Sequence, residues 1–466
     1  MQKDTLMPPL KSHAASPIAR LRRTLFTLAA GLLLLDTPAF AAPPIVQWTA
    51  PSGARVNFVE SRALPLLDIQ IDFAAGSALD PADKAGLAGL TRGLFEAGAG
   101  TLDEQGISDR IADIGAQIGG STDNDRSSLS IRSLSSASER DAAVELAALL
   151  LSQPTFPAAI LERERTRAIA GLREALTKPA TLAARSFNQA LFAGHPYGTT
   201  TTEASLKAIA REDLSAFHRR YFNAANASVT IVGDIDRAGA ERIAQQLTQA
   251  LPDSAATTPS LPQPKLPAAE VIRIPHPSAQ AHILVGQPGL SREDPDYFPL
   301  LVGNYILGGG GFVSRLTHEV REKRGFAYSV YSYFAPQRVA GPFQIGLQTR
   351  GSQTEDALKV VRQTLDTFIA EGPTEAELQA ARDNMINGFG LRLDSNRKIL
   401  DHIAMIGFYQ LRPDWLDHYP QAVAAVTREQ VQDAFARRIR PAHLITVIAG
   451  GDGDTAAAAT TPRAAR

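Results

Sequence analysis

The chain carries one pattern twice, and this internal repeat restricts the folds that it can adopt. Residues 211–221 followed by 229–233 recur as residues 428–439 followed by 446–450, at an offset of 217 or 218 positions. Each copy predicts a capped amphipathic helix, a short turn and a buried strand that ends at glycine. Because each copy closes one half of the chain, the repeat indicates two homologous domains.

A proline-rich stretch, residues 251–268, separates the two halves. Four of its prolines are Pro259, Pro262, Pro264 and Pro267. Proline lacks a backbone donor and fixes φ, so this stretch is predicted to be a semi-rigid linker rather than a helix or strand. The predicted domains are therefore residues 43–250 and 269–452, and the low-complexity tail at 453–466 is predicted to be disordered.

Strand and helix patterns are mixed within each half, which predicts an α+β fold. Residues 64–74 alternate apolar side chains with Asp68, Gln70 and Asp72, as a half-buried antiparallel strand does. Further strands are predicted at residues 127–134 and 282–287. The periodicity of apolar residues predicts helices at residues 84–96, 106–114, 138–151, 158–176, 297–307, 353–370 and 375–387.

The N-terminus has the pattern of an export signal. Three arginines precede an apolar segment at residues 24–35, and the A-x-A sequence at residues 39–41 predicts cleavage between Ala41 and Ala42. The apolar segment is shorter than the roughly 20 residues that a spanning helix needs, which disfavours an uncleaved anchor. No other stretch is long enough to span a membrane. We therefore expect a signal peptide at residues 1–41 and a periplasmic protein.

Composition excludes several classes of function. The absence of cysteine excludes disulfides, thiolate metal sites, cysteine nucleophiles and a lipoprotein anchor. The net charge of −1 gives no indication of nucleic-acid binding.

A run of glycines opens the segment with the clearest chemical content. The four glycines are Gly308, Gly309, Gly310 and Gly311. A predicted helix at residues 314–323 carries Arg321 near its end, and Tyr328 begins a strand-like stretch. Glycines allow close approach of backbone to a peptide, and a guanidinium with a phenol can hold a carbonyl and stabilise an oxyanion. Each feature alone also fits an ordinary loop, a charge at a helix C-terminus and a strand aromatic.

The complete run from Gly308 through Arg321 to Tyr328 resembles the C-terminal half of the M16 (pitrilysin/insulinase-like) metallopeptidases. The resemblance covers nearly all of the chain after residue 42. It implies two homologous halves, each a mainly antiparallel sheet covered by helices on one face, in a clam-shell arrangement. In that family the equivalents of Arg321 and Tyr328 reach a substrate at a zinc ion. The resemblance therefore implies that this pair is catalytic and that the four glycines bind substrate.

The N-terminal half departs from the family at its zinc motif. Active M16 enzymes carry H-x-x-E-H, in which two histidines bind zinc, the glutamate polarises water, and a downstream glutamate completes the site. Here the five motif positions begin at Gly89, end at Gly93 and carry Arg92 in place of the glutamate. We align the downstream glutamate with Ala170. The loss of three ligands and the base predicts that this chain binds no zinc.

The nine histidines offer no replacement for the motif on one helix. No two of them are three or four residues apart, so no two share a helix face as neighbouring ligands. His195 is in a segment common in the M16 family and is interpreted as structural. His218 is interpreted as a solvent-facing or hydrogen-bonded histidine of an amphipathic helix. A metal site assembled from distant parts of the chain stays open.

The resemblance implies the zinc-less subunit of an M16B-type bacterial pair. In such pairs one chain carries zinc, and its homologue supplies the glycine-rich loop, the arginine and the tyrosine. We expect a heterodimer with a zinc-bearing homologue, in which Arg321 and Tyr328 complete a site that hydrolyses peptides, and no cofactor in this chain. Two alternatives stay open: a purely binding or scaffolding protein, and an independent peptidase with an unconventional metal site.

Overall fold

The computed structural model describes residues 44–252 and 260–451. The predicted signal peptide, the predicted tail and the middle of the predicted linker lie outside the described residues. Within the two described ranges, no helix has the length and apolar content that crossing a bilayer requires.

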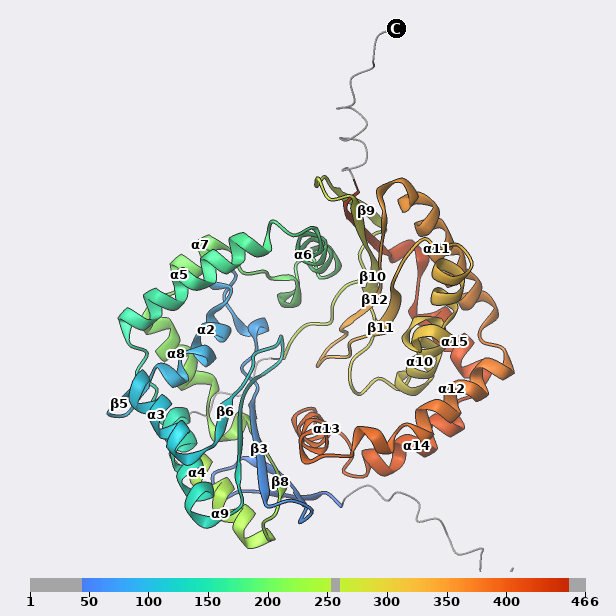
Figure 1. The fold of residues 1–466 in the computed structure, drawn as a ribbon. Helices are drawn as coiled ribbons and strands as arrows, with labels where there is room; N and C mark the ends of the chain where they lie inside the picture. The colour runs from blue at the N-terminus through green and yellow to red at the C-terminus, as the bar shows by residue number, and fades with distance from the viewer. Residues whose placement is uncertain (1–43, 253–259, 452–466) are drawn as a thin grey trace, which may run out of the picture. The chain divides into compact units, whose positions relative to one another are not determined.

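The first half of the chain builds a six-stranded sheet (Figure 1). In spatial order its strands are β1 (Val46–Thr49), β2 (Arg55–Glu60), β8 (Ala227–Gly233), β3 (Leu66–Phe73), β7 (Ser127–Leu134) and β6 (Gln117–Gly119). Strands β2 and β8 pair in parallel, and the other neighbours pair antiparallel. Helices α4 (Ala137–Ser152) and α9 (Arg237–Thr248) belong to the same apolar core as this sheet.

The second half builds a five-stranded sheet with the same connectivity. In spatial order its strands are β11 (Val330–Phe334), β12 (Pro342–Arg350), β10 (Gln280–Pro288), β13 (Ile445–Gly450) and β9 (Glu270–Ile274). Read from β9 to β11, this order repeats the order from β2 to β6, and the parallel pair again lies at the same place. The predicted duplication and the α+β class are therefore confirmed.

The helices agree closely with the predicted positions. Helix α12 (Glu375–Asn387) and strand β7 have the predicted bounds, whereas the predicted helix at residues 84–96 contains only a short α2 (Leu87–Gly93) between 3-10 turns. The remaining helices outside those already named are α3 (Glu104–Ile114), α5 (Ala158–Ala175), α6 (Pro179–Leu191), α7 (Glu203–Ala208), α8 (Arg211–Tyr221), α10 (Tyr297–Asn304), α11 (Thr354–Glu371), α13 (Asn396–Phe408), α14 (Trp415–Ala425) and α15 (Arg428–Arg438). A two-stranded ribbon joins β4 (Gly98–Ala99) to β5 (Leu102–Asp103).

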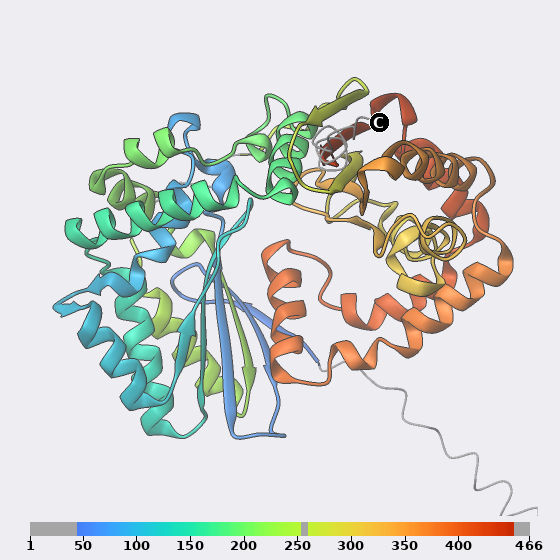
Figure 2. The same cartoon turned by 45° about the horizontal axis from the view of Figure 1, so that its top comes forward.

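Each half lends one helix to the sheet of the other half. Helix α6 packs on β10 and β13, where Ala183, Phe187 and Leu191 join the apolar side chains of β13. Helix α13, which begins 217 residues after α6, packs on β3 and β8. Figure 2 shows the first sheet between the helices of its own half and the orange α13. These reciprocal contacts join the two halves through buried surface rather than through the linker alone.

The position of α13 corrects the prediction of a half-buried β3. Its polar residues Asp68, Gln70 and Asp72 are buried, as are the apolar ones on the opposite face. The polar face is covered because α13 lies across it, so closely that a Cβ added at Gly407 would lie 2.0 Å from Nδ2 of Asn57. The alternating pattern was compatible with solvent on one side, and a segment from the other half of the chain replaces that solvent.

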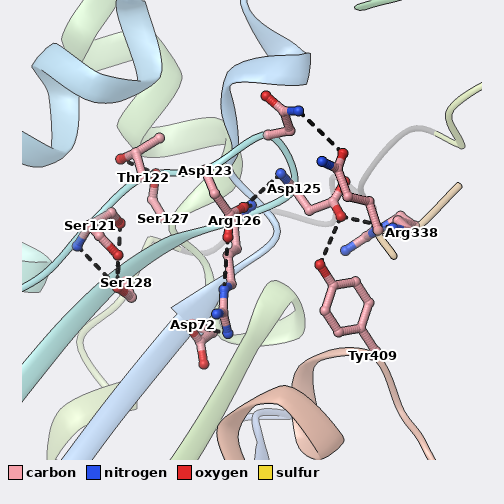
Figure 3. A network of polar contacts seen from close by, with 12 residues as sticks. Asp72, Ser121, Thr122, Asp123, Asp125, Arg126, Ser127, Ser128, Arg338 and Tyr409 are labelled. Atoms are coloured by element: carbon pink, nitrogen blue, oxygen red, sulfur yellow. Dashed lines mark hydrogen bonds and ion pairs between the residues drawn. The ribbon is translucent and has the colours of Figure 1, made fainter. Parts of the chain in front are cut away.

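A buried carboxylate, Asp125, also joins the two halves (Figure 3). Its Oδ1 accepts a hydrogen bond from the Tyr197 hydroxyl at 2.5 Å. Its Oδ2 accepts one from the Tyr409 hydroxyl at 2.9 Å and one from the backbone N–H of Arg338 at 2.8 Å. Burial, and then the charge of Asp125, raises the pKa of both phenols, so both stay protonated as donors. Asp125 thus ties the first half to two separate segments of the second.

Candidate functional site

Helix α2 carries the degenerate motif and is held at its N-terminus by Asp80. The Asp80 carboxylate accepts hydrogen bonds from the backbone N–H groups of Gly86 and Ala88, both at 2.8 Å. These are donors that the first turn of a helix leaves without partners. Gly89 and Gly93 are exposed, and a Cβ added at either would meet no atom within 4 Å. One face of α2 is therefore open and carries no side chain that could bind a cation.

Arg92 is buried at the position where the motif glutamate was expected. Its side chain is only 4% exposed. Nε donates to the Ser128 carbonyl at 2.5 Å, and Nη1 donates to both carboxylate oxygens of Glu96 at 3.1 Å. The guanidinium fits in this position because residue 120 is glycine; an added Cβ there would lie 2.5 Å from Nη2 of Arg92. A positive charge with its own carboxylate partner thus occupies this site.

The glycine run forms a turn in which Gly308 is buried, Gly310 is half-buried, and Gly309 and Gly311 are exposed. A Cβ at Gly308 would lie 2.6 Å from the backbone nitrogen of Ser332 on β11, so only glycine fits there. Gly311 has a φ of +62°, a conformation that favours glycine. Phe312 and Val313, which follow it, are 68% and 73% exposed.

Arg321 and Tyr328 lie together, as the sequence predicts. Arg321 is in a π-helical turn (Thr317–Glu322), and its guanidinium carbon lies 5.0 Å from the ring centroid of Tyr328. It also lies 4.8 Å from the ring of Phe312, so the guanidinium is held between two aromatic rings. Tyr328 precedes β11 instead of beginning it, and it is 85% exposed.

The hydrogen-bonding groups of this pair are unused. Among the described residues, the Arg321 guanidinium makes no ion pair or hydrogen bond, and neither does the Tyr328 hydroxyl. Most of the arginines that the structure describes pair with carboxylates, for example Arg315 with Glu377. A half-buried guanidinium beside an exposed phenol, neither of which hydrogen-bonds within the described residues, is available to a ligand.

A cavity of about 640 Å³ adjoins Tyr328. One wall is α6, and the other is the face of the second sheet that α6 leaves uncovered. Tyr328 is the only one of the predicted site residues in its described lining. The degenerate helix α2 lines other, smaller cavities, so the structure brings Arg321 and Tyr328 together but does not place them with Gly89 or Gly93.

Comparisons with known proteins agree with this architecture. A family model described as Insulinase (Peptidase family M16) matches residues 62–205, and one described as Peptidase M16 inactive domain matches residues 208–385. A solved structure of a peptidase M16 inactive domain from Pseudomonas fluorescens is 36% identical, covers 87% of this chain and 98% of its own, and has a TM-score of 0.83. The chain belongs to the M16 peptidase family.

Relatives within the M16 family have different names. An uncharacterized zinc protease of Streptomyces coelicolor is 30% identical over a match that covers 51% of this chain and 53% of that protein. A protein of Helicobacter pylori named non-peptidase homolog YmxG is 25% identical, over 80% of this chain and 85% of that protein. Proteins similar to this M16 chain thus include one named a protease and one named a non-peptidase.

The residues at the M16 metal position do not fit a zinc ion. Zinc requires deprotonated sulfur, nitrogen or oxygen ligands, and this position offers two glycines and a buried guanidinium. The described part of the chain contains no group of three or more His, Asp or Glu side chains that could hold a metal. His218 donates from Nε2 to the Leu151 carbonyl (2.8 Å), and His195 donates from Nε2 to the Pro262 carbonyl (2.9 Å), as expected of structural histidines.

The neighbouring helix α5 adds carboxylates that the sequence analysis did not consider. A cavity of about 230 Å³ lies against Gly89 and Gly93, and α5 contributes Glu164, Arg167 and Ala168 to its lining. Ala170, which we align with the downstream glutamate of active M16 enzymes, is exposed on α5 and does not line that cavity. Glu164 forms ion pairs with arginines of its own helix. The i,i+4 spacing of Arg92 and Glu96 could have indicated their ion pair from sequence.

A partly buried ion pair anchors the segment that carries the glycine run and Arg321. Arg315 donates from Nε and Nη2 to the two carboxylate oxygens of Glu377 on α12, each at 2.7 Å. Burial raises the pKa of the Glu377 carboxyl, but hydrogen bonds from Arg315 and Thr374 outweigh burial and bring it to about 2. The bidentate contact fixes the direction in which the chain leaves the glycine turn.

We expect this ion pair to make folding stability sensitive to acid. The folded pKa of Glu377 is below its unfolded value of 4.5, so its contribution is present above pH 4.5 and lost as the pH falls toward 2. Replacement of Glu377 by glutamine should flatten the dependence of the unfolding free energy on pH in this window. Urea unfolding at several pH values between 7 and 2.5 would measure it. Equal slopes for the two proteins would contradict the assignment.

Proposed function

We propose that this M16 chain is the zinc-less subunit of an exported peptidase pair. Its partner is a homologous M16 chain that carries an intact H-x-x-E-H motif. In the pair, Arg321 and Tyr328 reach the peptide at the partner's site, while residues 308–311 let the backbone approach that peptide closely. The export signal read at residues 1–41 supports a periplasmic location for both chains.

The observation that carries this proposal is the contrast between two arginines. Arg92 is buried, hydrogen-bonded and ion-paired where a catalytic glutamate is expected, so this position supplies no base to activate water. Arg321 is accessible, and its guanidinium has only aromatic neighbours. The contacts of Arg92 favour an inactive metal position. The lack of hydrogen bonds at Arg321 favours a side chain that binds a ligand.

The chemistry available to Arg321 and Tyr328 is binding and charge stabilisation. A guanidinium presents several N–H donors in a fixed plane, and a phenol adds an O–H donor. Donors aimed at a carbonyl oxygen stabilise the negative charge that develops there when the carbonyl is attacked. Both groups are assigned the role of hydrogen-bond donors, so activation of the nucleophile is assigned to the partner.

The names of similar proteins also support a zinc-less subunit. The similar structure from Pseudomonas fluorescens is titled an inactive domain, and the relative from Helicobacter pylori is named a non-peptidase homolog. Neither name states a partner, so the heterodimer is part of the proposal.

The test measures zinc content and peptide hydrolysis for the purified chain, alone and mixed with a zinc-bearing M16 homologue of the same cell. We expect negligible zinc and hydrolysis in the chain alone, and hydrolysis on mixing that exceeds the sum of the separate rates. Stoichiometric zinc with activity in the lone chain would overturn the proposal. A stable complex without increased hydrolysis would instead favour a binding or scaffolding protein.

A further inference from the structure

We propose that the cavity beside Tyr328 is a peptide subsite of this chain that prefers an acidic side chain. The proposal deepens the proposed function, because it names the class of substrate. It rests on the residues that line the 640 Å³ cavity, most of which have no part in the role proposed for Arg321 and Tyr328.

The cavity exists because α6 covers only part of the second sheet. Helix α6 packs on β10 and β13, and its cavity-facing residues Ala180, Ala183 and Ala184 are small. Strands β11 and β12 extend beyond it. In the first sheet α13 covers the corresponding polar face, whereas here the polar face stays open. A volume of this size is within the roughly 300–1,000 Å³ of ligand pockets.

The exposed sheet face presents aromatic rings and amides to this space. Tyr331 and Tyr333 are stacked with ring centroids 6.0 Å apart. Tyr331 lies flat on β12, and glycine at Gly346 makes this possible, since an added Cβ would lie 2.5 Å from the ring. Four glutamines complete the polar lining: Gln280, Gln344, Gln348 and Gln353. Amides and phenols both donate and accept, as recognition of a peptide backbone requires.

The location at a sheet edge favours an extended peptide. Strand β11 is the terminal strand of the second sheet and pairs only with β12 among the described strands. The outer backbone groups of such a strand can pair with an added strand, except at Ser332, whose C=O already accepts a hydrogen bond from Asn304 at 3.1 Å. A peptide beside β11 would run past Tyr331 and Tyr333, which point from β11 into the cavity.

The charge of the cavity lining determines which side chain of a bound peptide the cavity should prefer. Among its lining residues are Arg350 and His282, and none is a carboxylate. Arg350 is exposed, and its side chain contacts Gln353 at 3.1 Å instead of an acidic group. Burial lowers the pKa of His282, so the charge at neutral pH comes from Arg350, with Arg321 stacked on Tyr328 nearby. Positive charge without a local counterion favours a glutamate or aspartate of the peptide.

The experiment measures fluorescence anisotropy of labelled peptides with the purified chain, without a partner. Three unstructured peptides of about ten residues differ only at a central Glu, Gln or Lys. We expect the Glu peptide to bind about fivefold more tightly than the Lys peptide. Arg350→Glu should reverse this order. Arg242→Glu is the matched control, because Arg242 is exposed on α9 and should leave the order unchanged.

Filling the cavity provides a second test that does not depend on charge. Ala184→Trp and Ala180→Trp place a large ring in the cavity from exposed positions of α6, and each should weaken binding of all three peptides by about tenfold. Ala238→Trp, on the exposed face of α9, is the control. Equal binding of the three peptides, or unchanged binding in both tryptophan variants with unchanged melting temperatures, would overturn the subsite.

The two proposals fail separately. Increased hydrolysis on mixing, without any preference in the binding assay, would remove the acidic subsite and leave the proposed function intact. A preference that Arg350→Glu reverses, without increased hydrolysis on mixing, would support the subsite and remove the peptidase pair.

Discussion

Replacement of Arg321 by alanine is expected to lower hydrolysis by the mixed M16 pair by about a hundredfold, as loss of one oxyanion donor does in other hydrolases. The loss should be in kcat, because the guanidinium is assigned to charge that develops during the reaction. Tyr328→Phe keeps the ring that stacks on Arg321 and removes only the hydroxyl. Tyr328→Phe should therefore also lower kcat. The measurement is steady-state hydrolysis of an unstructured peptide by the pair.

Three comparisons make this result specific. Arg321→Lys retains the positive charge without the planar fork, so it should recover only part of the rate. Arg242→Ala removes an exposed arginine from α9 and should leave the rate unchanged. Thermal unfolding of the lone chain should be the same for Arg321→Ala as for the unsubstituted protein, since the guanidinium makes only aromatic contacts. Full turnover in both Arg321→Ala and Tyr328→Phe would defeat the role proposed for the pair.

Replacement of Asp125 by alanine is expected to destabilise the folded chain by about 4 kcal/mol. The substitution removes the acceptor of three donors: the Tyr197 hydroxyl, and the Tyr409 hydroxyl and Arg338 backbone N–H that Figure 3 shows. Asp125 is 5% exposed, so water does not readily replace it. Because both Tyr409 and Arg338 belong to the second half, the loss should weaken the contact between the halves. Urea unfolding monitored by fluorescence would measure it.

The control for Asp125 is an acidic residue without such contacts. Asp113 is exposed on α3, and Asp113→Ala should change the unfolding free energy by less than about 0.5 kcal/mol. Asp125→Asn retains one acceptor oxygen, so its unfolding free energy should lie between those of Asp125→Ala and Asp113→Ala. An unfolding free energy for Asp125→Ala within error of that for Asp113→Ala would show that the network does not hold the halves together.

Local patterns in the sequence predicted the elements whose neighbours lie in the same half. Strand β7 and helix α12 have the predicted bounds, because alternating or helically spaced apolar residues face one core. The proximity of Arg321 and Tyr328 was implied by the family resemblance alone, and the structure adds that Gly325, which lies between them, has a φ of +63°. Phe312 was not singled out, and its contact with Arg321 depends on how the glycine turn folds back.

The sequence did not indicate the two helices that pack on the sheet of the opposite half. Helices α6 and α13 were not predicted, and their buried faces rest on the sheet of the other half. The burial of Asp68 and Asp72 follows from α13 and could not be read from the alternation within β3. Arg92 likewise gave no sign that it would be buried, because its partner Ser128 is on β7 and the space for it exists at Gly120.

The sequence by itself determined the duplicated α+β architecture and the family, because these depend on residue types and periodicities within short segments; the loss of the metal ligands stays a prediction from the sequence. The tertiary structure decided which surfaces are buried and which are left open. It places Arg92 against Glu96 in the interior, leaves Arg321 half-buried beside an exposed Tyr328, and leaves the polar face of the second sheet partly uncovered. The physical reason is that burial depends on which distant segment covers a surface, and the exchange of α6 and α13 between the halves is a long-range contact.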